Sequence, residues 1–288
     1  MRNQVLGSGL LAGTQTALAP FELYRPRSAE EAVQAYHEAP DATLLAGSTD
    51  LVARFREGLS PRAVIALSGV TAWRDVIDDG DLLRLGALAT HHSGPRDLVL
   101  RERLPSLADA WARIATVRIR ARATLGGNLM ARQSRYETPV MLAALDAELE
   151  LSALDGERRV TLAQLWRGDS APAGVLHHVR VPLANLVLFD YERSMRPLLT
   201  VALAVRTRGS ALRVTATVGS EYRRPVTVWE DVDAPALSGV DPEAVGRALA
   251  AQLPDEIGDY VGSAAYRRRV VAVLIRRRLN ALARPAAA

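Results

Sequence analysis

The 288-residue sequence predicts an α+β protein, in which alternating helices and strands are followed by an antiparallel sheet and a closing helix. Three observations support this: helix and strand patterns alternate up to about residue 180, strands of period two follow, and a helical pattern closes the chain. The change of pattern and Pro182 predict a boundary. We expect an N-terminal extension (1–19), a first domain (20–180, subdomains about 20–70 and 71–180) and a second domain (181–284).

The first domain opens with a helix over residues 28–39, since Ser28 can cap it and acidic residues fill its first turn. A short apolar strand and a turn of small residues follow, and the next helix begins near Asp50. Two further strands are expected at 62–69 and 82–90. The second of these follows the turn DDGD and is expected to form half of a hairpin.

An amphipathic helix is expected over 104–115, and another begins at about Pro139 and runs into a strand. The pattern then changes, and LVLFDYERS, LLTVALAVRTRG and ALRVTATVGS alternate at period two like an antiparallel meander. The basic segment YRRRVVAVLIRRRL, residues 266–279, has apolar residues at helical spacing. It predicts an amphipathic helix whose arginines are solvated or face a partner.

The composition excludes several kinds of chemistry. Cysteine is absent, which excludes disulfides, thiol nucleophiles and cysteine-ligated zinc or iron–sulfur sites within this chain. Lysine is absent too, so all 36 basic residues are arginines and neither a Schiff base nor a lysine-bearing P-loop can form. The net charge of +4 does not indicate nucleic-acid binding, because 32 acidic residues are interspersed and aromatic residues are only 5%.

No apolar run reaches the roughly 20 residues that span a bilayer, so no membrane span is expected. The N-terminal segment MRNQVLGSGLLAGTQTALAP resembles a secretory signal only loosely, because glycines and polar residues dilute its apolar stretch. We expect it to be an unstructured or peripheral extension. An arginine-only, alanine-rich composition is typical of a GC-rich bacterial genome.

Two turns of small residues are the main candidates for a binding site: AGSTD at 46–50 and TLGGN at 124–128. Each follows an apolar segment and would leave main-chain amides accessible to an anion. Together they could hold a pyrophosphate, although either could be an ordinary tight turn. Neither matches the G-x-G-x-x-G or G-x-x-x-x-G-K pattern, and their spacing alone does not decide.

Several segments, in one order, resemble the FAD-binding medium subunits of molybdenum hydroxylases, the family of carbon monoxide dehydrogenase and xanthine dehydrogenase flavoproteins. LLAGSTDLVARFREG resembles their first flavin turn, and LPSLADAWARIATVRIRARATLGGNL contains the second. LRLGALATHH, ETPVMLAALDAELEL, VLHHVRVP, LLTVALAV and GSAAYRRRVVAVLIRRRL are similar as well. The resemblance covers roughly residues 20–280.

The resemblance implies a PCMH-type fold, like that of vanillyl-alcohol oxidase, in which FAD lies between two α/β subdomains, followed by an antiparallel-sheet-and-helix domain. It places the pyrophosphate at the two turns, where Gly126 and Gly127 would give clearance, and places Leu176 near the isoalloxazine ring. Tyr191 and Arg193 would reach the ring from the second domain. The implied cofactor-binding residues are Ala46, Gly47, Ser48, Thr49, Asp50, Thr124, Leu125, Gly126, Gly127, Asn128, Glu137 and Leu176.

The sequence departs from the family at several positions. Ser48 stands where a second glycine is usual, which has a cost if the position needs a positive φ. Residues 132–134 replace a usual Ala-Ser-Pro, and Glu137 matches an aspartate that contacts FAD. Pro197 stands where an aspartate is common, and a lysine often found near the ring is missing.

Two pairs of adjacent histidines are weaker candidates, and no metal site is expected. His91 and His92 follow a strand, where neighbouring side chains point to opposite faces, so a turn or a surface near the flavin is favoured. For the same reason His177 and His178 should alternate across a strand, which favours a structural role.

Three functions remain open. The first is an oxidoreductase subunit that relays electrons through FAD from a molybdopterin large subunit and a 2Fe-2S small subunit to NAD, a quinone or oxygen, in the cytoplasm. The second is a standalone FAD enzyme of secondary metabolism that acts on a small molecule, motivated by residues 132–134, Pro197 and the N-terminal extension. The third is a binding scaffold that has lost its flavin.

Overall fold

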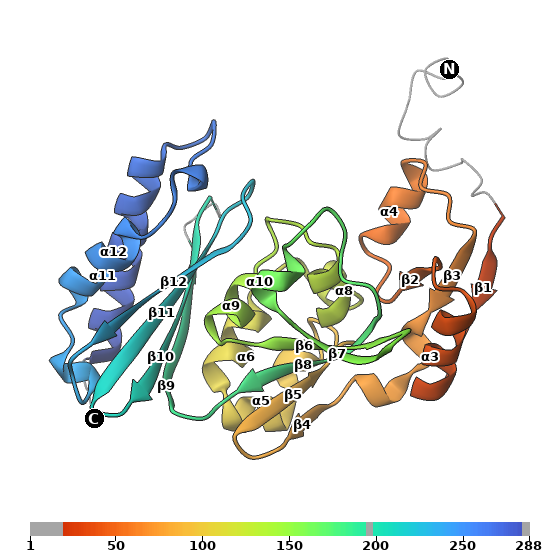
Figure 1. Cartoon of the computed structure of the whole chain (residues 1–288), viewed down its shortest axis with the longest axis horizontal. Coiled ribbons are helices and arrows are strands. Elements are labelled where there is room, and N and C mark those ends of the chain that lie inside the picture. Colours follow the sequence, from red (N-terminus) through yellow and green to blue (C-terminus); the bar gives the residue numbers. More distant parts are fainter. Residues whose placement is uncertain (1–19, 194–197, 284–288) are drawn as a thin grey trace.

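The computed structural model describes residues 20–193 and 198–283. These residues form three sheets that follow one another along the long axis of the molecule (Figure 1). A three-stranded sheet lies at one end, a five-stranded sheet in the middle and a four-stranded sheet at the other end. The expected N-terminal extension, Pro197 and residue 284 lie outside the described residues.

The first sheet is parallel and small. Its elements in chain order are β1 (Glu22–Tyr24), α3 (Ala29–Glu38), β2 (Thr43–Leu45), α4 (Leu51–Arg56), β3 (Ala63–Ala66) and the 3-10 turns η1 (Leu67–Gly69) and η2 (Thr71–Trp73). The strands lie in the order β1-β3-β2. Ser28 caps α3 as expected, because its hydroxyl accepts a hydrogen bond from the amide of Glu31. The α3 side chains Ala32 and Tyr36 pack with Ile65 and Trp73 in a separate small core.

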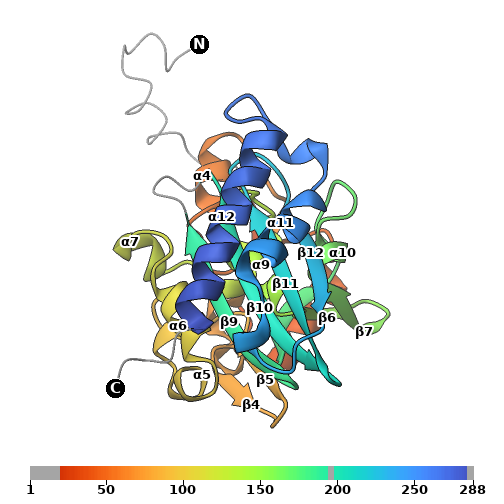
Figure 2. The same ribbon diagram turned by 90° about the vertical axis from the view of Figure 1, so that its left-hand side faces the viewer.

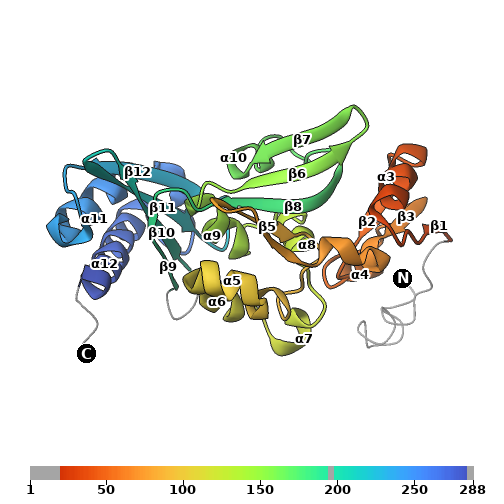
Figure 3. The same cartoon turned by 90° about the horizontal axis from the view of Figure 1, so that it is seen from below.

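The middle sheet is antiparallel and carries helices on one face (Figure 3). Its strands are β4 (Val76–Asp78), β5 (Leu82–Gly86), β6 (Glu148–Ala153), β7 (Gly156–Thr161) and β8 (Val175–Pro182). Its helices are η3 (Gly94–Arg96), α5 (Leu98–Arg103), α6 (Pro105–Ala112), α7 (Val117–Arg120), α8 (Leu125–Met130), α9 (Thr138–Ala144) and α10 (Leu162–Leu165). The order β4-β5-β8-β6-β7 places β8 at the centre, and the expected β4–β5 hairpin is confirmed.

The last sheet is the expected meander. Its elements are β9 (Leu186–Arg193), β10 (Thr200–Arg208), β11 (Ala211–Gly219), β12 (Val226–Val232), η4 (Leu237–Gly239), α11 (Pro242–Ala251), η5 (Asp255–Ile257) and α12 (Ala264–Ala283). Its strands pair in the order β12-β11-β10-β9. Helices α11 and α12 lie on one face of this sheet (Figure 2), and α9 lies toward the other.

Two helical expectations need correction. The helix expected over 104–115 is present but shorter, since α6 runs from Pro105 to Ala112; proline fits the first turn of a helix but not its interior, so α5 and α6 are separate helices. The arginines of α12 are not all solvated. The side chain of Arg267 is 2% exposed and forms an ion pair with Asp259, Nη2 to Oδ2 2.6 Å, beneath the loop that precedes the helix.

Candidate flavin site

A cavity of about 450 Å³ lies between the first sheet and the middle of the molecule. Its walls come from β2, from the β2–α4 turn, from the segment around α7 and α8, and from β8. Its size is within the usual range for small-molecule sites. Both glycine-bearing turns of the sequence border it.

Most of the predicted site residues line this cavity. They are Ala46, Gly47, Ser48, Thr49, Asp50, Thr124, Gly126, Gly127, Asn128, Glu137 and Leu176. Leu125 does not, because its side chain is buried in the core of the middle part. Tyr191 and Arg193 also lie outside the cavity wall and reach it only through Glu137.

The two turns touch, although about 75 residues of sequence separate them. A Cβ on Gly47 would lie 2.2 Å from the carbonyl oxygen of Arg122 and 2.8 Å from the Cα of Ala123. Only glycine therefore allows the first turn to meet the segment that enters the second.

Ser48 has a positive φ of 68°. The position therefore needs the left-handed conformation for which glycine is usual, and serine adopts it at a cost of roughly 1–2 kcal/mol. Its hydroxyl donates to the carbonyl oxygen of Ala46 at 3.4 Å, within the turn.

The free amides belong to the first turn. The main-chain amides of residues 47–50 donate to no described group. In the second turn the amides of residues 125–128 all donate within the protein, to the carbonyl oxygens of Ala87, Ala89 and Thr124 and to the Thr124 hydroxyl. The expectation of two turns with accessible amides is therefore wrong for the second turn, because TLGGN begins helix α8 with Thr124 as its cap.

The two glycines of the second turn have different neighbours. A Cβ on Gly126 would lie 2.9 Å from the Cβ of Ala87, so close packing on the end of β5 requires this glycine. A Cβ on Gly127 would lie 2.9 Å from the Thr124 Oγ1 and 3.9 Å from the Cβ of Ala46, between the two turns. A side chain at position 127 would therefore obstruct the cavity more than a side chain at position 126.

Asn128 has a fixed orientation. Its Oδ1 accepts a hydrogen bond from the hydroxyl of Thr138 at the start of α9. Its amide nitrogen makes no hydrogen bond to another described residue and remains a donor at the cavity wall.

Glu137 joins the cavity to the last sheet. The Tyr191 hydroxyl donates to its Oε2 at 2.7 Å, and Arg193 Nη1 donates to its Oε1 at 3.2 Å. Burial and the nearby Glu137 carboxylate raise the pKa of Tyr191 far above its usual value, so this phenol stays protonated. Both candidate residues of β9 thus hold Glu137 in place.

His91 is a site residue whose role the sequence left undefined. It is 1% exposed and lines the cavity, whereas His92 is exposed. Burial and the positive charge of Arg120 lower the pKa of His91 to about 4, so its ring is neutral near pH 7. Trp111 Nε1 donates to His91 Nδ1 at 2.8 Å, which leaves the proton on Nε2. This buried Nε2 has no hydrogen-bond partner among the described residues.

Arg54, Arg135 and Tyr136 line the cavity and were not predicted. The two arginines can supply positive charge where lysine is missing. The Tyr136 hydroxyl donates to Asp50 Oδ1 at 3.2 Å and links α4 to the segment after α8. Folding brings these residues to the site. In the sequence, their nearness to the two turns was the one indication that they could lie there.

These features suit FAD. The amides of residues 47–50, which donate to no described group, and the two arginines fit a pyrophosphate. The Asn128 amide and the His91 Nε2 are donors without partners among the described residues. Leu44, Leu88 and Leu176 give apolar walls. The buried Nε2 of His91 is the observation that best supports a bound group. A buried donor requires a hydrogen-bond acceptor, and the described protein residues do not provide one.

The second histidine pair departs from expectation. His177 and His178 do not alternate across β8, because their ring nitrogens Nδ1 lie 2.9 Å apart. The β6–β8 pairing shifts register beside them, which explains why sequence spacing gave the wrong result.

None of the helices in the described parts of the chain is long and apolar enough to cross a membrane.

The chain matches the family model described as "FAD binding domain in molybdopterin dehydrogenase" over residues 19–184. It is 30% identical to the nicotine 6-hydroxylase medium subunit of Paenarthrobacter nicotinovorans, over 88% of this chain and 93% of that protein. It is 26% identical to the carbon monoxide dehydrogenase medium chain of Afipia carboxidovorans, over 89% and 94%.

Solved structures show the same fold. The quinoline 2-oxidoreductase of Pseudomonas putida superimposes with a TM-score of 0.74 at 22% identity, over 93% of this chain and 98% of that chain. The carbon monoxide dehydrogenase of Oligotropha carboxidovorans gives a TM-score of 0.75 at 23% identity, over 91% and 97%. The expected α+β fold of the PCMH type is thereby confirmed.

Proposed function

This chain belongs to the family of FAD binding domains in molybdopterin dehydrogenases, and we propose that it relays electrons from a molybdenum and iron–sulfur partner to an acceptor. It is an FAD-dependent oxidoreductase subunit. The proposal rests on similarity to proteins named as medium chains or subunits over 88–89% of this chain. A chain without cysteine cannot ligate an iron–sulfur cluster through thiolates, so a 2Fe-2S small subunit and a molybdopterin large subunit would be separate chains.

When bound, FAD supplies the redox chemistry, accepting two electrons and releasing them singly or as a pair. The protein residues bind and orient it. The amides of residues 47–50 would hold the pyrophosphate, with Arg54 and Arg135 offsetting its charge. His91 Nε2 and the Asn128 amide would donate hydrogen bonds, and Leu176 would exclude water from the ring. Glu137, held by Tyr191 and Arg193, would fix the wall toward the last sheet.

No observation favours the standalone enzyme. Of the features that motivated it, residues 132–134 do not line the cavity, and Pro197 and the N-terminal extension lie outside the described residues. Arg132 Nη2 donates to the carbonyl oxygen of Gly168 at 2.8 Å, and the Ser134 hydroxyl donates to that of Glu221 at 2.6 Å. These contacts tie the segment after α8 to neighbouring loops. The flavin-free scaffold is unsupported too, because the chain carries the FAD-binding family domain.

The proposal includes the division of the chain into an FAD-binding domain (20–180) and a second domain (181–284), and a cytoplasmic location. The acceptor is NAD, a quinone or oxygen.

The decisive experiment is co-purification from the native host, followed by a visible spectrum. We expect flavin and iron–sulfur bands in a heteromeric complex. A single chain that carries flavin and oxidises a small molecule unaided would contradict the proposed electron relay.

A further inference from the structure

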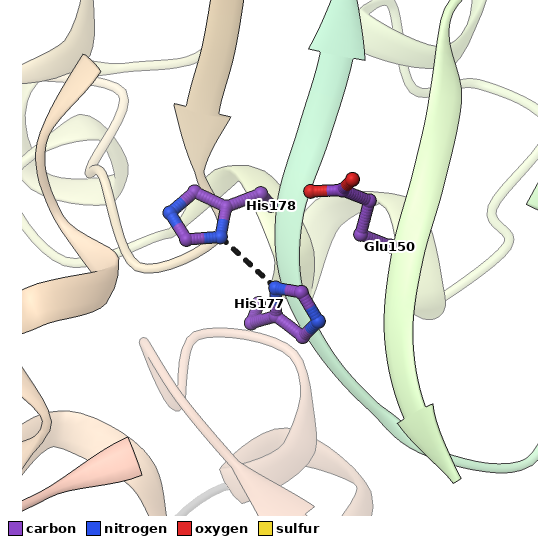
Figure 4. Close-up of side chains that lie close together, drawn as sticks. All are labelled: Glu150, His177 and His178. Carbon is purple, nitrogen blue, oxygen red and sulfur yellow. Dashed lines mark hydrogen bonds between the residues drawn. The ribbon is translucent and has the colours of Figure 1, made fainter. Parts of the chain in front are cut away.

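Three ligand-type side chains come together outside the flavin site. They are Glu150 on β6 and the adjacent residues His177 and His178 on β8 (Figure 4). Their ligand atoms all lie within 4.8 Å of one another, and the two Nδ1 atoms are 2.9 Å apart. Neither the proposed electron relay nor FAD binding uses them.

A β-bulge creates this cluster. Glu150 pairs with His178, but the next residue, Leu151, pairs with Leu176, so His177 is the extra residue of β8. A bulge removes the strict alternation of side chains, so two consecutive histidines can face one point. Bulges re-aim side chains at functional sites.

The hydrogen bonds leave a lone pair on each Nδ1. His177 Nε2 lies 2.8 Å from Glu157 Oε2, and Ser152 Oγ donates to the other oxygen of that carboxylate at 2.5 Å. Nε2 is thus the donor of His177, and in the neutral ring Nδ1 is unprotonated. A carboxylate behind a histidine in this way is the usual second partner of a metal ligand.

His178 is likewise able to bind a cation. Its Nδ1 accepts from Arg84 Nη2 at 3.3 Å, so the proton is on Nε2, which is buried without a partner among the described residues. The side chain is 6% exposed. The two Nδ1 atoms face each other at 2.9 Å, a separation that requires a proton or a metal cation between them.

Three arginines face Glu150 and oppose the binding of a metal cation; the most distant is Arg159, whose Nε lies 4.0 Å from Glu150 Oε1. Arg84 Nε and Arg180 Nη1 each donate to an oxygen of Glu150 at 3.0 Å. A carboxylate has about four lone-pair sites, so both bonds can persist while Glu150 coordinates. The contact from Arg84 to His178 would be lost, and the positive charge of Arg84 would limit the affinity.

Solvent reaches the cluster through an open groove between α3 and the middle sheet, lined by His37, Trp73 and Glu157 among others. The His177 side chain is 13% exposed at its floor. A metal at about 2.0–2.2 Å from each ligand requires the two Nδ1 atoms to separate by about 0.4 Å. Small rotations of the rings provide this.

We propose that Glu150, His177 and His178 form a site for a divalent transition metal of the zinc type, with water completing the coordination. Two imidazoles and one carboxylate suit Zn²⁺ and exclude Ca²⁺ or Mg²⁺ as preferred ions. Glu157 orients His177 as a positioning residue.

The test is isothermal titration of the FAD-loaded, EDTA-treated protein with ZnCl₂ near neutral pH. We expect one zinc per chain with micromolar affinity. His177→Ala and His178→Ala should abolish it, and Glu157→Gln should weaken it about 10- to 100-fold. His92→Ala, an exposed histidine outside the cluster, is the matched control and should bind like the wild type. Bound FAD reports that each variant is folded.

Arg84→Gln sharpens the test, because removing the charge beside His178 should tighten zinc binding. Absence of stoichiometric zinc binding, or wild-type zinc binding by His177→Ala and His178→Ala, would overturn the proposal and leave a shared proton between the rings. Unchanged or weaker binding in Arg84→Gln would remove His178 Nδ1 from the ligand set.

Discussion

At the residue scale, Ser48 is a strained position in the first flavin turn. Its φ of 68° is one that glycine adopts without steric cost. We expect Ser48→Gly to raise the free energy of unfolding by about 0.5 kcal/mol, since relief of strain exceeds the entropy that glycine adds to the unfolded chain. Urea denaturation measures this. Ser60→Gly, at an exposed loop serine without a positive φ, should instead be neutral or destabilising.

His91 provides the second residue-scale prediction. His91→Leu removes the buried Nε2 donor and should weaken FAD binding by up to about tenfold, the value of one hydrogen bond. His91→Gln can place an amide donor near the same point and should retain more affinity. Flavin fluorescence on titration measures both dissociation constants. Equal losses in the two variants would show that the ring packs against FAD without donating to it.

The lowered pKa of His91 also predicts acid sensitivity. Its folded pKa of about 4 lies below the unfolded value of about 6.5, so between these values the unfolded state binds more protons. Stability is therefore full above about pH 6.5 and falls as the pH drops toward 4, by at most about 1.4 kcal/mol per unit for this group. Urea midpoints across this range should fall less steeply in His91→Gln, and His92→Gln should match the wild type.

At the element scale, a buried ion pair holds the loop before α12. Asp259 accepts from the amides of Val261 and Gly262 and from Arg267. Burial raises the pKa of Asp259, but these donors outweigh it and lower the pKa overall. Arg267→Leu leaves this carboxylate buried and unpaired and should cost about 3–5 kcal/mol in thermal or urea unfolding.

A double-mutant cycle separates the pair from the packing. Asp259→Asn with Arg267→Leu should cost clearly less than the sum of the single changes, because neither charge is then left unpaired. Strict additivity would mean that the two side chains do not interact. Arg276→Leu, at an exposed arginine of the same helix, should change stability by about 1 kcal/mol or less.

Elements were predictable where a local rule decides them, as with the Ser28 cap and the alternating strands of the meander. The bulge at His177 was not, because it depends on the register between β6 and β8, which are some 25 residues apart in sequence. The helical start at TLGGN was missed for a similar reason. Thr124 can cap α8, but two glycines are poor helix formers and favoured a turn.

At the scale of the whole molecule, Gly47 lets the first sheet approach the middle of the chain. Gly47→Ala would place a Cβ against the carbonyl of Arg122 and force the two turns apart. We expect loss of FAD retention and destabilisation, measured by bound flavin and melting temperature. Gly239→Ala, where a Cβ would lie 3.3 Å from another Cβ, should retain FAD and lose about 1 kcal/mol or less.

The sequence predicted the overall fold and the two turns through several ordered motifs, and composition excluded cysteine and lysine chemistry. The contact between the turns, the role of Arg54 and Arg135, and the hold of Tyr191 on Glu137 could not be predicted, because they arise only when distant segments pack. Ser48 shows the intermediate case. The sequence indicated that a positive φ at this position would have a cost, and the structure shows that the φ is positive.

Strand β10 belongs to two hydrophobic cores at once. Ala202 and Ala204 pack into the core of the middle part, while Val201, Leu203 and Val205 pack against α11 and α12. Because neighbouring positions of one strand serve both cores, neither can melt without exposing the other. The described chain from β4 onward should therefore behave as a single cooperative unit in calorimetry, although its motifs divide into two regions.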